Sequence, residues 1–283
     1  MGLKSKVKKA GRFVLSNLGR PVRVEQSLRG ESALLSGRCV VVTGAASGIG
    51  FATAAACLRA GADVVVTSRS LDRAKDACGR LGGGTRCAGP FRCRVDGGAG
   101  RCAVRRRAAP VDALVNNAGV LKGAAFGRTA VADFDEVVGT NLRGTYFLTQ
   151  EVARRMVKEG LKGNICFVTS SSAYRPATNA YSCTKWALRG LTEGAAKMLA
   201  PHGIVVNAVA PGPTATAMLL EGDAGNVMLP RSPIGRYVTP EEIAEMVVTL
   251  LSDASRSVIG DTVRMTGGSG VVTFDDADAT FEL

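Results

Sequence analysis

Short apolar runs alternate with longer stretches of helical periodicity along most of the chain. The apolar runs are rich in Val and Ile, which favour strands, and lie at 39–43, 63–67, 111–115, 164–169, 204–209 and 262–265. Helix-compatible stretches lie between them, at 48–60, 70–78, 133–159, 180–200 and 240–253. Strands that alternate with helices are typical of βαβ units, and continuous apolar strands are typical of a parallel sheet covered on both faces. The pattern therefore predicts one α/β domain built on a doubly wound parallel sheet.

The two ends of the chain differ from this central pattern. Residues 1–36 are expected to form a basic N-terminal extension, 37–270 the Rossmann-type domain and 271–283 a C-terminal tail. Within 1–24, apolar residues recur at helical spacing between lysines, so this segment is compatible with a helix lying on a membrane surface or a partner. Gly11, Gly19 and Pro21 favour the alternative, a solvated and frayed extension.

The basic charge is concentrated in two places. The formal net charge is +12, of which residues 1–24 and residues 78–110 carry +7 each and the remainder −2. Neither segment interleaves aromatic residues with its basic ones, as proteins that stack single-stranded bases do. This distribution argues against nucleic acid as a partner.

The cysteines and the N-terminus indicate where the protein works. The chain has 8 Cys and 1 His, with no C-x-x-C pair, so no metal site is expected. No apolar run approaches the length of about 20 residues that a membrane span needs, and no signal peptide is evident. Reduced thiols in the cytoplasm are the simplest interpretation.

A glycine-rich turn joins the first predicted strand to the first predicted helix, in the run Thr43-Gly-Ala-Ala-Ser-Gly-Ile-Gly50. Glycines allow backbone to approach a pyrophosphate closely, and the free N–H groups at the start of the helix then face the phosphates. The position between strand and helix makes this signal stronger than glycine spacing alone. We expect the cofactor contacts here to come from Gly44, Ser47, Gly48, Ile49 and Gly50.

The second predicted strand ends at Thr67-Ser68-Arg69. An acidic residue at this point would accept a hydrogen bond from a ribose 2′-hydroxyl and favour NAD, whereas an arginine can pair with a 2′-phosphate. Ser68 and Arg69 therefore favour NADP(H) over NAD(H). The alternative is that Arg69 is a solvated residue at the start of a helix.

The candidate reaction centre is the pair Tyr181 and Lys185, which a helix places one turn apart on one face. A phenol has an ordinary pKa of about 10, and a neighbouring ammonium is expected to lower it, so that the phenol can exchange a proton with a carbonyl or alcohol oxygen. Upstream, a predicted buried strand ends in three hydroxyls at 170–172. Such a hydroxyl points into the ligand crevice of a parallel sheet, although all three could simply cap the strand.

In this combination the chain resembles the short-chain dehydrogenase/reductase family, in its shorter single-domain branch that includes 3-oxoacyl reductases. The resemblance runs from about residue 36 to 270. It is carried by the TGxxxGxG pattern, Asn116-Asn-Ala-Gly119, Asn141, Ser170, Tyr-x-x-x-Lys at 181–185, and Pro211-Gly212 followed by Thr216.

The resemblance implies an NAD(P)(H)-dependent oxidoreductase in which hydride passes between nicotinamide and a ketone, aldehyde or secondary alcohol. Tyr181 would be the acid/base, Lys185 would bind the nicotinamide ribose and depress the Tyr181 pKa, Ser170 would polarise the substrate oxygen, and Asn141 would hold a relay water. A homodimer or homotetramer is implied. Further cofactor contacts are implied for Asp96, Asn116, Ala118, Gly119, Pro211, Gly212, Thr214 and Thr216.

Two departures from the family pattern bear on these expectations. Ser170 lies 11 residues before Tyr181, where 12 or 13 is common in the family, so Ser171 is the rival assignment. Between Asp96 and Asn116 a full helix is usual in the family, but here residues 97–110 begin with helix-weakening glycines and have no clear apolar stripe. Residues 78–110 as a whole are dominated by Gly, Arg and Cys, so that helical layer over the sheet and the affinity for the cofactor are both in doubt. A non-catalytic dinucleotide-binding or regulatory protein is therefore the alternative function.

Three segments are expected to contact the substrate, at 121–126, 172–179 and 217–233. Their apolar residues suit a small hydrophobic carbonyl or alcohol substrate, although a lid that simply packs on the core would have the same composition. Arg175 could bind an acidic substrate group. The residues in question are Phe126, Tyr174, Met218, Leu219, Leu220, Met228 and Leu229.

Overall fold

A computed structural model of the chain describes residues 34–82, 87–91, 110–216 and 226–270. All strands of its seven-stranded sheet run parallel, in the order β3-β2-β1-β4-β5-β6-β7. The strands are β1 (Cys39–Val42), β2 (Asp63–Thr67), β3 (Cys87–Phe91), β4 (Ala113–Asn116), β5 (Asn164–Val168), β6 (Val205–Pro211) and β7 (Thr262–Met265). The predicted doubly wound parallel sheet is confirmed.

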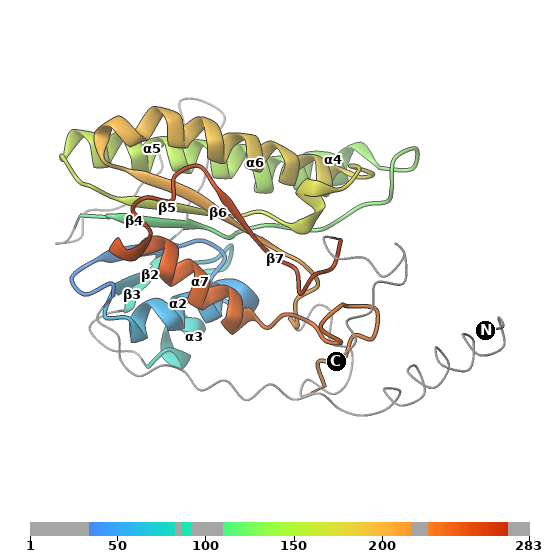
Figure 1. The fold of residues 1–283 in the computed structure, drawn as a ribbon, viewed down its shortest axis with the longest axis horizontal. Helices are drawn as coiled ribbons and strands as arrows, with labels where there is room; N and C mark the ends of the chain where they lie inside the picture. Colours follow the sequence, from blue (N-terminus) through green and yellow to red (C-terminus); the bar gives the residue numbers. More distant parts are fainter. Residues whose placement is uncertain (1–33, 83–86, 92–109, 217–225, 271–283) are drawn as a thin grey trace, which may run out of the picture.

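Helices cover both faces of the sheet (Figure 1). On one face lie α2 (Gly48–Arg59), α3 (Leu71–Arg80) and α7 (Pro240–Leu251). On the other lie α4 (Val131–Val138), α5 (Thr145–Lys158) and α6 (Ala180–Leu199). Short helical turns, three of them 3-10 and one π, complete the described chain: η1 (Gly139–Gly144), η2 (Ser171–Tyr174), η3 (Ala200–His202) and η4 (Asp253–Ser255).

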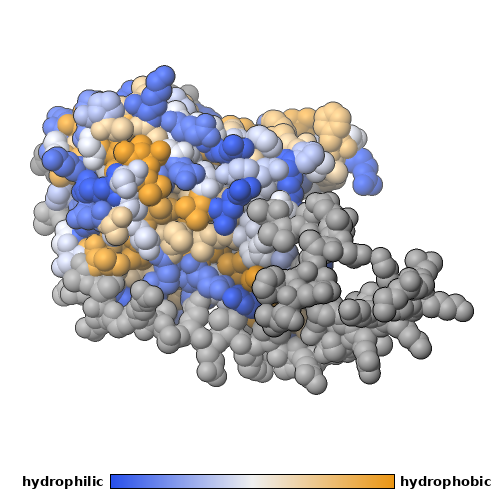
Figure 2. Space-filling model, viewed as in Figure 1, coloured by the Kyte–Doolittle hydropathy of each residue, from blue (hydrophilic) through white to orange (hydrophobic). Residues whose placement is uncertain are grey.

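Each face of the sheet has its own core. Val40 and Val42 pack in the cluster under α2 and α7, whereas Val41 packs in the cluster under α5 and α6. This alternation follows from the period of two along a strand, and it explains why β1 is an unbroken apolar run. In Figure 2 the outer surface of the described residues mixes polar and apolar side chains. No helix among the described residues is long and apolar enough to cross a membrane.

Two elements differ from the sequence prediction. Strand β3 lies within the unusual 78–110 segment and was not predicted, because Gly89 and Pro90 are poor strand residues. It pairs with β2 through an irregular register at the edge of the sheet, where a proline can be accommodated. The single helix predicted over 133–159 is divided by the π-helical turn η1 into α4 and α5.

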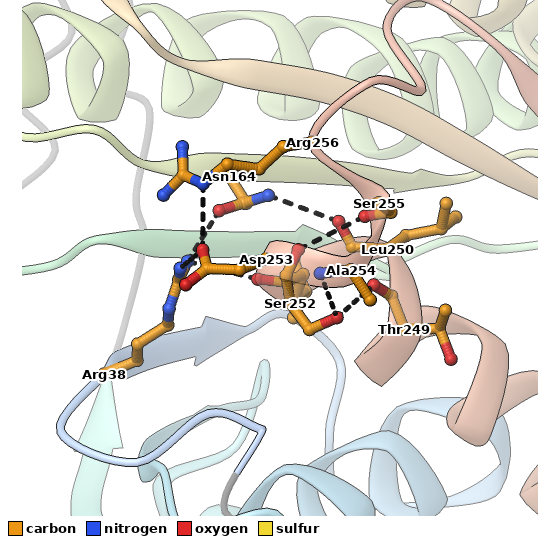
Figure 3. Close-up of polar contacts among 10 residues, drawn as sticks. Arg38, Asn164, Thr249, Leu250, Ser252, Asp253, Ala254, Ser255 and Arg256 are labelled. Atoms are coloured by element: carbon orange, nitrogen blue, oxygen red, sulfur yellow. Dashed lines mark hydrogen bonds and ion pairs between the residues drawn. The ribbon is translucent and has the colours of Figure 1, made fainter.

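A polar network ties α7 to the edge of the sheet where the strands begin (Figure 3). Arg38, directly before β1, donates to Oδ1 of Asn164 at 2.6 Å and to the Leu251 carbonyl at 3.1 Å. Its other terminal nitrogen lies 2.6 Å from Oδ1 of Asp253. The Arg38 side chain is only 15% exposed, so these contacts compensate for the burial of its charge. The network lies at the N-terminal ends of the strands, whereas the candidate site lies at their C-terminal ends.

The N-terminal extension (1–33), most of the 78–110 segment and the C-terminal tail lie outside the described residues. So do Asp96, Met218, Leu219 and Leu220, and the expectations placed on them stay predictions.

Candidate active site

The glycine-rich turn after β1 forms a tight cradle in front of α2. Gly44 and Gly48 have positive φ angles of 64° and 55°, which favour glycine. A Cβ on Gly44 would lie 2.9 Å from Cα of Ala118, so no side chain fits there. Ser47 precedes α2 and makes no side-chain capping bond, which leaves the first N–H groups of the helix available. Close backbone and free N–H groups are what a pyrophosphate requires.

Thr43 and Asn117 hold this cradle in place. The Thr43 hydroxyl accepts from the backbone N–H groups of Asn117 and Ala118, both at 2.9 Å. The Asn117 side-chain amide donates to the carbonyls of Thr43 and Gly44 at 2.9 and 3.2 Å. Sequence analysis missed both residues, although the Asn116-Asn117 pair was the available signal.

Asn116 has a different environment from its neighbour. Its side chain is buried and donates to the Thr149 hydroxyl on α5 at 2.9 Å, and its Oδ1 has no hydrogen-bond partner among the described residues. The side chain that contacts the cradle is therefore that of Asn117, and Asn116 turns towards α5 instead. Gly119 lies nearer to the reaction centre, since a Cβ built on it would be 3.5 Å from Oδ1 of Asn141 and 3.8 Å from Nζ of Lys185.

The end of β2 borders the same cradle. The Ala45 N–H donates to the Thr67 carbonyl at 3.0 Å. Beyond it, the Ser68 hydroxyl accepts from the Ser70 N–H at 3.4 Å and Ser70 caps α3. The Arg69 side chain is 75% exposed, and its contact with Glu136 is long, at 3.9 Å. Arg69 is therefore accessible to an anionic ligand.

Ser170 and Tyr181 meet where β5 ends and α6 begins. Asn179 caps α6 by accepting from the Ser182 N–H at 2.9 Å, which places Tyr181 in the first turn of the helix. Ser170 lies close enough to Tyr181 for a side-chain interaction that lowers the pKa of the phenol. Ser170 Oγ also accepts from the Ser172 N–H at 3.1 Å. Ser170, and not Ser171, is the serine that affects the pKa of Tyr181, which supports Ser170 as the residue beside the phenol.

Lys185 lies beneath the phenol. Its ammonium group is buried, donates to the Val168 carbonyl at 2.8 Å and lies 5.4 Å from the centroid of the Tyr181 ring. Burial lowers the pKa of Lys185 to about 8. At neutral pH this lysine remains largely protonated, but its charge is costly to keep in the interior.

The expected fall in the Tyr181 pKa is not found. Burial raises the pKa of Tyr181 above its ordinary value of 10, and the hydrogen bond with Ser170 offsets part of that rise. The loss of water around the buried phenol, which residue spacing does not reveal, outweighs the effect of the neighbouring ammonium. A raised pKa keeps the phenol protonated at neutral pH, so Tyr181 is suited to donate a proton.

Asn141 links the π-helical turn to the loop after β4 and to α6. Its amide donates to the Val120 carbonyl at 2.9 Å and to the Thr184 hydroxyl at 3.3 Å, while its oxygen accepts from the Val120 N–H at 2.8 Å. π-Helical turns are frequent at functional sites. Both N–H groups of the Asn141 side chain are engaged in these bonds. The relay water expected at Asn141 would therefore have to bond to a carbonyl oxygen of Asn141, either of the side chain or of the backbone.

The loop after β6 closes the other side of the site. Gly212 donates to the Met265 carbonyl at 2.9 Å, and a Cβ on it would lie 2.7 Å from Cα of Thr266. The Thr214 hydroxyl donates to the Gly212 carbonyl at 2.9 Å. Thr216 reaches the first cradle, because its Cγ2 would be 3.4 Å from a Cβ on Gly48. The Pro211–Thr216 loop and the glycine-rich turn are therefore neighbours in space.

Two of the three segments predicted to contact the substrate lie next to each other in the structure. The Phe126 N–H donates to the Thr178 carbonyl at 2.7 Å, which joins 121–126 to 172–179. The Phe126 side chain is 93% exposed, whereas Leu229 is buried. Leu229 thus packs as part of the core, and Phe126 lines no closed pocket.

Comparison with known proteins places the chain among oxidoreductases. A family model described as enoyl-(acyl carrier protein) reductase matches residues 44–269. Gluconate 5-dehydrogenase of Gluconobacter oxydans is 36% identical over 247 residues, which cover 83% of this chain and 95% of that protein. Several hundred further curated proteins match as well.

Solved structures agree with this assignment. A short-chain dehydrogenase/reductase family protein superimposes with a TM-score of 0.73 and 37% identity, covering 83% of this chain and 98% of its own. A 3-oxoacyl-[acyl-carrier protein] reductase from Brucella melitensis with bound NAD has a TM-score of 0.77 and 31% identity, covering 88% and 98%. Two further neighbours contain bound NADP.

Proposed function

Because this chain belongs to the short-chain dehydrogenase/reductase family, and is accordingly an NAD(P)-dependent oxidoreductase acting on ketones or alcohols, we propose that it is an NADP(H)-preferring carbonyl reductase. The observation that carries the proposal is the placement of Ser170 beside Tyr181, whose ring centroid lies 5.4 Å from the buried ammonium of Lys185. The family assignment favours this catalytic function over the non-catalytic alternative.

In the proposed reaction Tyr181 is the proton donor. Its raised pKa keeps the phenol protonated at neutral pH, which suits reduction of a carbonyl to an alcohol. Ser170 donates a hydrogen bond to the substrate oxygen and so stabilises the negative charge that develops there. Lys185 holds a positive charge beneath the phenol, which favours the phenolate left after proton transfer.

The residues present fit a nicotinamide dinucleotide. When bound, the reduced cofactor supplies the hydride that the protein itself cannot supply. The cradle formed by Gly44, Gly48 and the start of α2 would hold its pyrophosphate. Lys185, together with the loop from Pro211 to Thr216, would hold its nicotinamide end. Asn141 and Gly119 would line the path between these two ends.

Preference for NADP(H) is supported by the end of β2. Arg69 occupies the place where an acidic residue would select NAD, and its side chain is largely exposed. Solved relatives contain either NAD or NADP, so this preference rests on the residues of this chain.

The proposed substrate is a small ketone or aldehyde with apolar character, and the proposed assembly is a homodimer or homotetramer. Aromatic side chains on α5 and α6 are partly exposed, among them Tyr146, Phe147 and Trp186. Aromatic residues are enriched at protein interfaces.

The test is turnover with a panel of carbonyl compounds. Purified protein is mixed with NADPH or NADH and with ketones, 3-oxoacyl thioesters or keto sugar acids, and the reduced nicotinamide absorbance is followed. We expect turnover with NADPH that is lost in Tyr181→Phe. Absence of turnover with every carbonyl, in protein that binds the cofactor, would contradict the proposal.

A further inference from the structure

Arg80, the last residue of α3, reaches the glycine-rich turn from the side. Its Nη2 donates to the Ala46 carbonyl at 2.8 Å, and its Cζ lies 4.4 Å from the centroid of the Phe51 ring. Its Nε lies 3.0 Å from Oδ2 of Asp76, one helical turn earlier. These three contacts fix the guanidinium beside the turn even though the side chain is 50% exposed.

The part of the turn that Arg80 touches is the part that borders β2. Ala45, the residue before Ala46, donates to the Thr67 carbonyl at 3.0 Å, and Arg69 follows two residues after Thr67. In a doubly wound sheet the adenosine ribose of a dinucleotide binds between the first turn and the end of the second strand. Arg80 therefore stands beside that position, although it belongs to neither segment.

Charge and hydrogen-bonding capacity both suit an anion at this place. Asp76 is the only acid paired with Arg80 among the described residues, and Nη1 of Arg80 makes no hydrogen bond to any of them. Arg69 lies 3.9 Å from Glu136, which Lys122 already contacts at 2.8 Å. A guanidinium with a free nitrogen can bind phosphate oxygens through directed N–H groups.

We propose that Arg80 is a cofactor-specificity residue: its guanidinium binds the 2′-phosphate of NADP while it braces the glycine-rich turn through Ala46. This inference rests on the proposed function, and it adds to Arg69 a second arginine that the sequence pattern did not single out. A residue that only braced the turn would affect NAD and NADP alike, because both share the pyrophosphate. A residue that contacts the 2′-phosphate must affect NADP more.

The test compares dissociation constants for NADP and NAD, measured by calorimetry, in the wild type, Arg80→Met and Arg80→Lys. Lys75→Met is the matched control, because it removes one exposed positive charge from the same helix. We expect Arg80→Met to weaken NADP binding about tenfold more than NAD binding, which is the loss of about one charge-assisted hydrogen bond. Arg80→Lys should show a smaller loss of NADP binding relative to NAD binding. Lys75→Met should leave the ratio of the two dissociation constants unchanged.

The outcomes separate this inference from the proposed function. A wild type that binds neither dinucleotide refutes the proposed function itself. A wild type that prefers NADP, with Arg80→Met weakening both cofactors equally or neither, overturns the role of Arg80 alone. Should Arg80→Met fail to fold by circular dichroism, Arg80→Lys carries the test, since it keeps the charge and most of the side-chain length, and an unchanged NADP/NAD ratio in that variant overturns the inference.

Discussion

Lys185 donates a hydrogen bond to the Val168 carbonyl at 2.8 Å, so the last residue of β5 fixes the ammonium that lies beneath Tyr181. The contact joins the C-terminal end of β5 to α6, close to the place where Ser170 lies beside Tyr181. The relative position of strand and helix is therefore set by the groups proposed to carry out the reaction. The activity of the protein is expected to depend on this arrangement.

Replacing Lys185 with Met should abolish most activity without loss of fold stability. The buried ammonium has a pKa lowered to about 8 from 10.5, so its protonated form is disfavoured in the folded state. Removing it should leave the free energy of unfolding at pH 7 unchanged or raise it, by at most about 3 kcal/mol. Urea unfolding and turnover with NADPH measure the two effects.

The stability of the wild type relative to Lys185→Met should depend on pH. The penalty from Lys185 is fully present below about pH 8 and disappears as pH rises towards 10.5, the ordinary lysine value. Wild-type stability relative to Lys185→Met should therefore increase across this interval. A relative stability that falls as pH rises would contradict the assignment of a lowered pKa.

The rate of carbonyl reduction should be insensitive to Tyr181 ionisation near neutral pH. Because burial raises the pKa of Tyr181 above 10, the phenol stays protonated until alkaline pH, and the reduction rate should fall only there. Ser170→Ala removes the bond that lowers this pKa, so the alkaline limb should move to higher pH. The same variant should lower kcat by about ten- to a hundredfold, because a donor to the substrate oxygen is lost.

These profiles are measured as kcat against pH with NADPH. Thr192→Ala serves as a control, because among the described residues this buried α6 hydroxyl bonds within its own helix, to the Leu188 carbonyl at 2.8 Å. An alkaline limb that stays in place in Ser170→Ala would show that Ser170 does not influence the phenol.

Asn117→Ala should weaken cofactor binding without selectivity. The variant loses two hydrogen bonds to the Thr43 and Gly44 carbonyls, so the glycine-rich turn is less well fixed. We expect the dissociation constants for NADP and NAD to rise together by about tenfold, as measured by fluorescence titration. A selective effect on one cofactor would mean that Asn117 has a role beyond holding the turn.

Arg38→Met should destabilise the fold while leaving kcat unchanged. Arg38 is largely buried and satisfies Asn164, the Leu251 carbonyl and Asp253 at the far edge of the sheet. Its loss should lower the free energy of unfolding by about 1–3 kcal/mol. Arg59→Met is the control, because the Arg59–Glu245 pair is exposed and should contribute less than about 1 kcal/mol. Equal losses in the two variants would exclude a special role for the network.

Sequence patterns predicted the features that depend on local spacing. The valine run of β1, the glycines of the following turn and the one-turn spacing of Tyr181 and Lys185 each depend on residues close together in the chain. Strand β3 was not predicted, because Gly89 and Pro90 have a low propensity for strands. The strand forms through its pairing with β2, which is a tertiary interaction that the local sequence does not reveal.

Orientation and burial were the two properties that spacing could not supply. The sequence Asn116-Asn117 does not indicate which side chain points towards α5 and which one bonds to the glycine-rich turn. Likewise, the shift in the Tyr181 pKa has the opposite sign from the one expected, because desolvation depends on what surrounds the phenol in three dimensions.

The π-helical turn at Gly139–Gly144 also constrains how the sequence can change in length. A π turn contains more residues than an α turn, so it sets the rotational phase of α5 relative to α4. Deleting one residue there would permit regular α-helix between α4 and α5, but the residues of the turn itself would take new positions around the helix axis. Asn141 would then face a different neighbour, so single-residue insertions and deletions should be tolerated far less in this turn than in the surface loops around it.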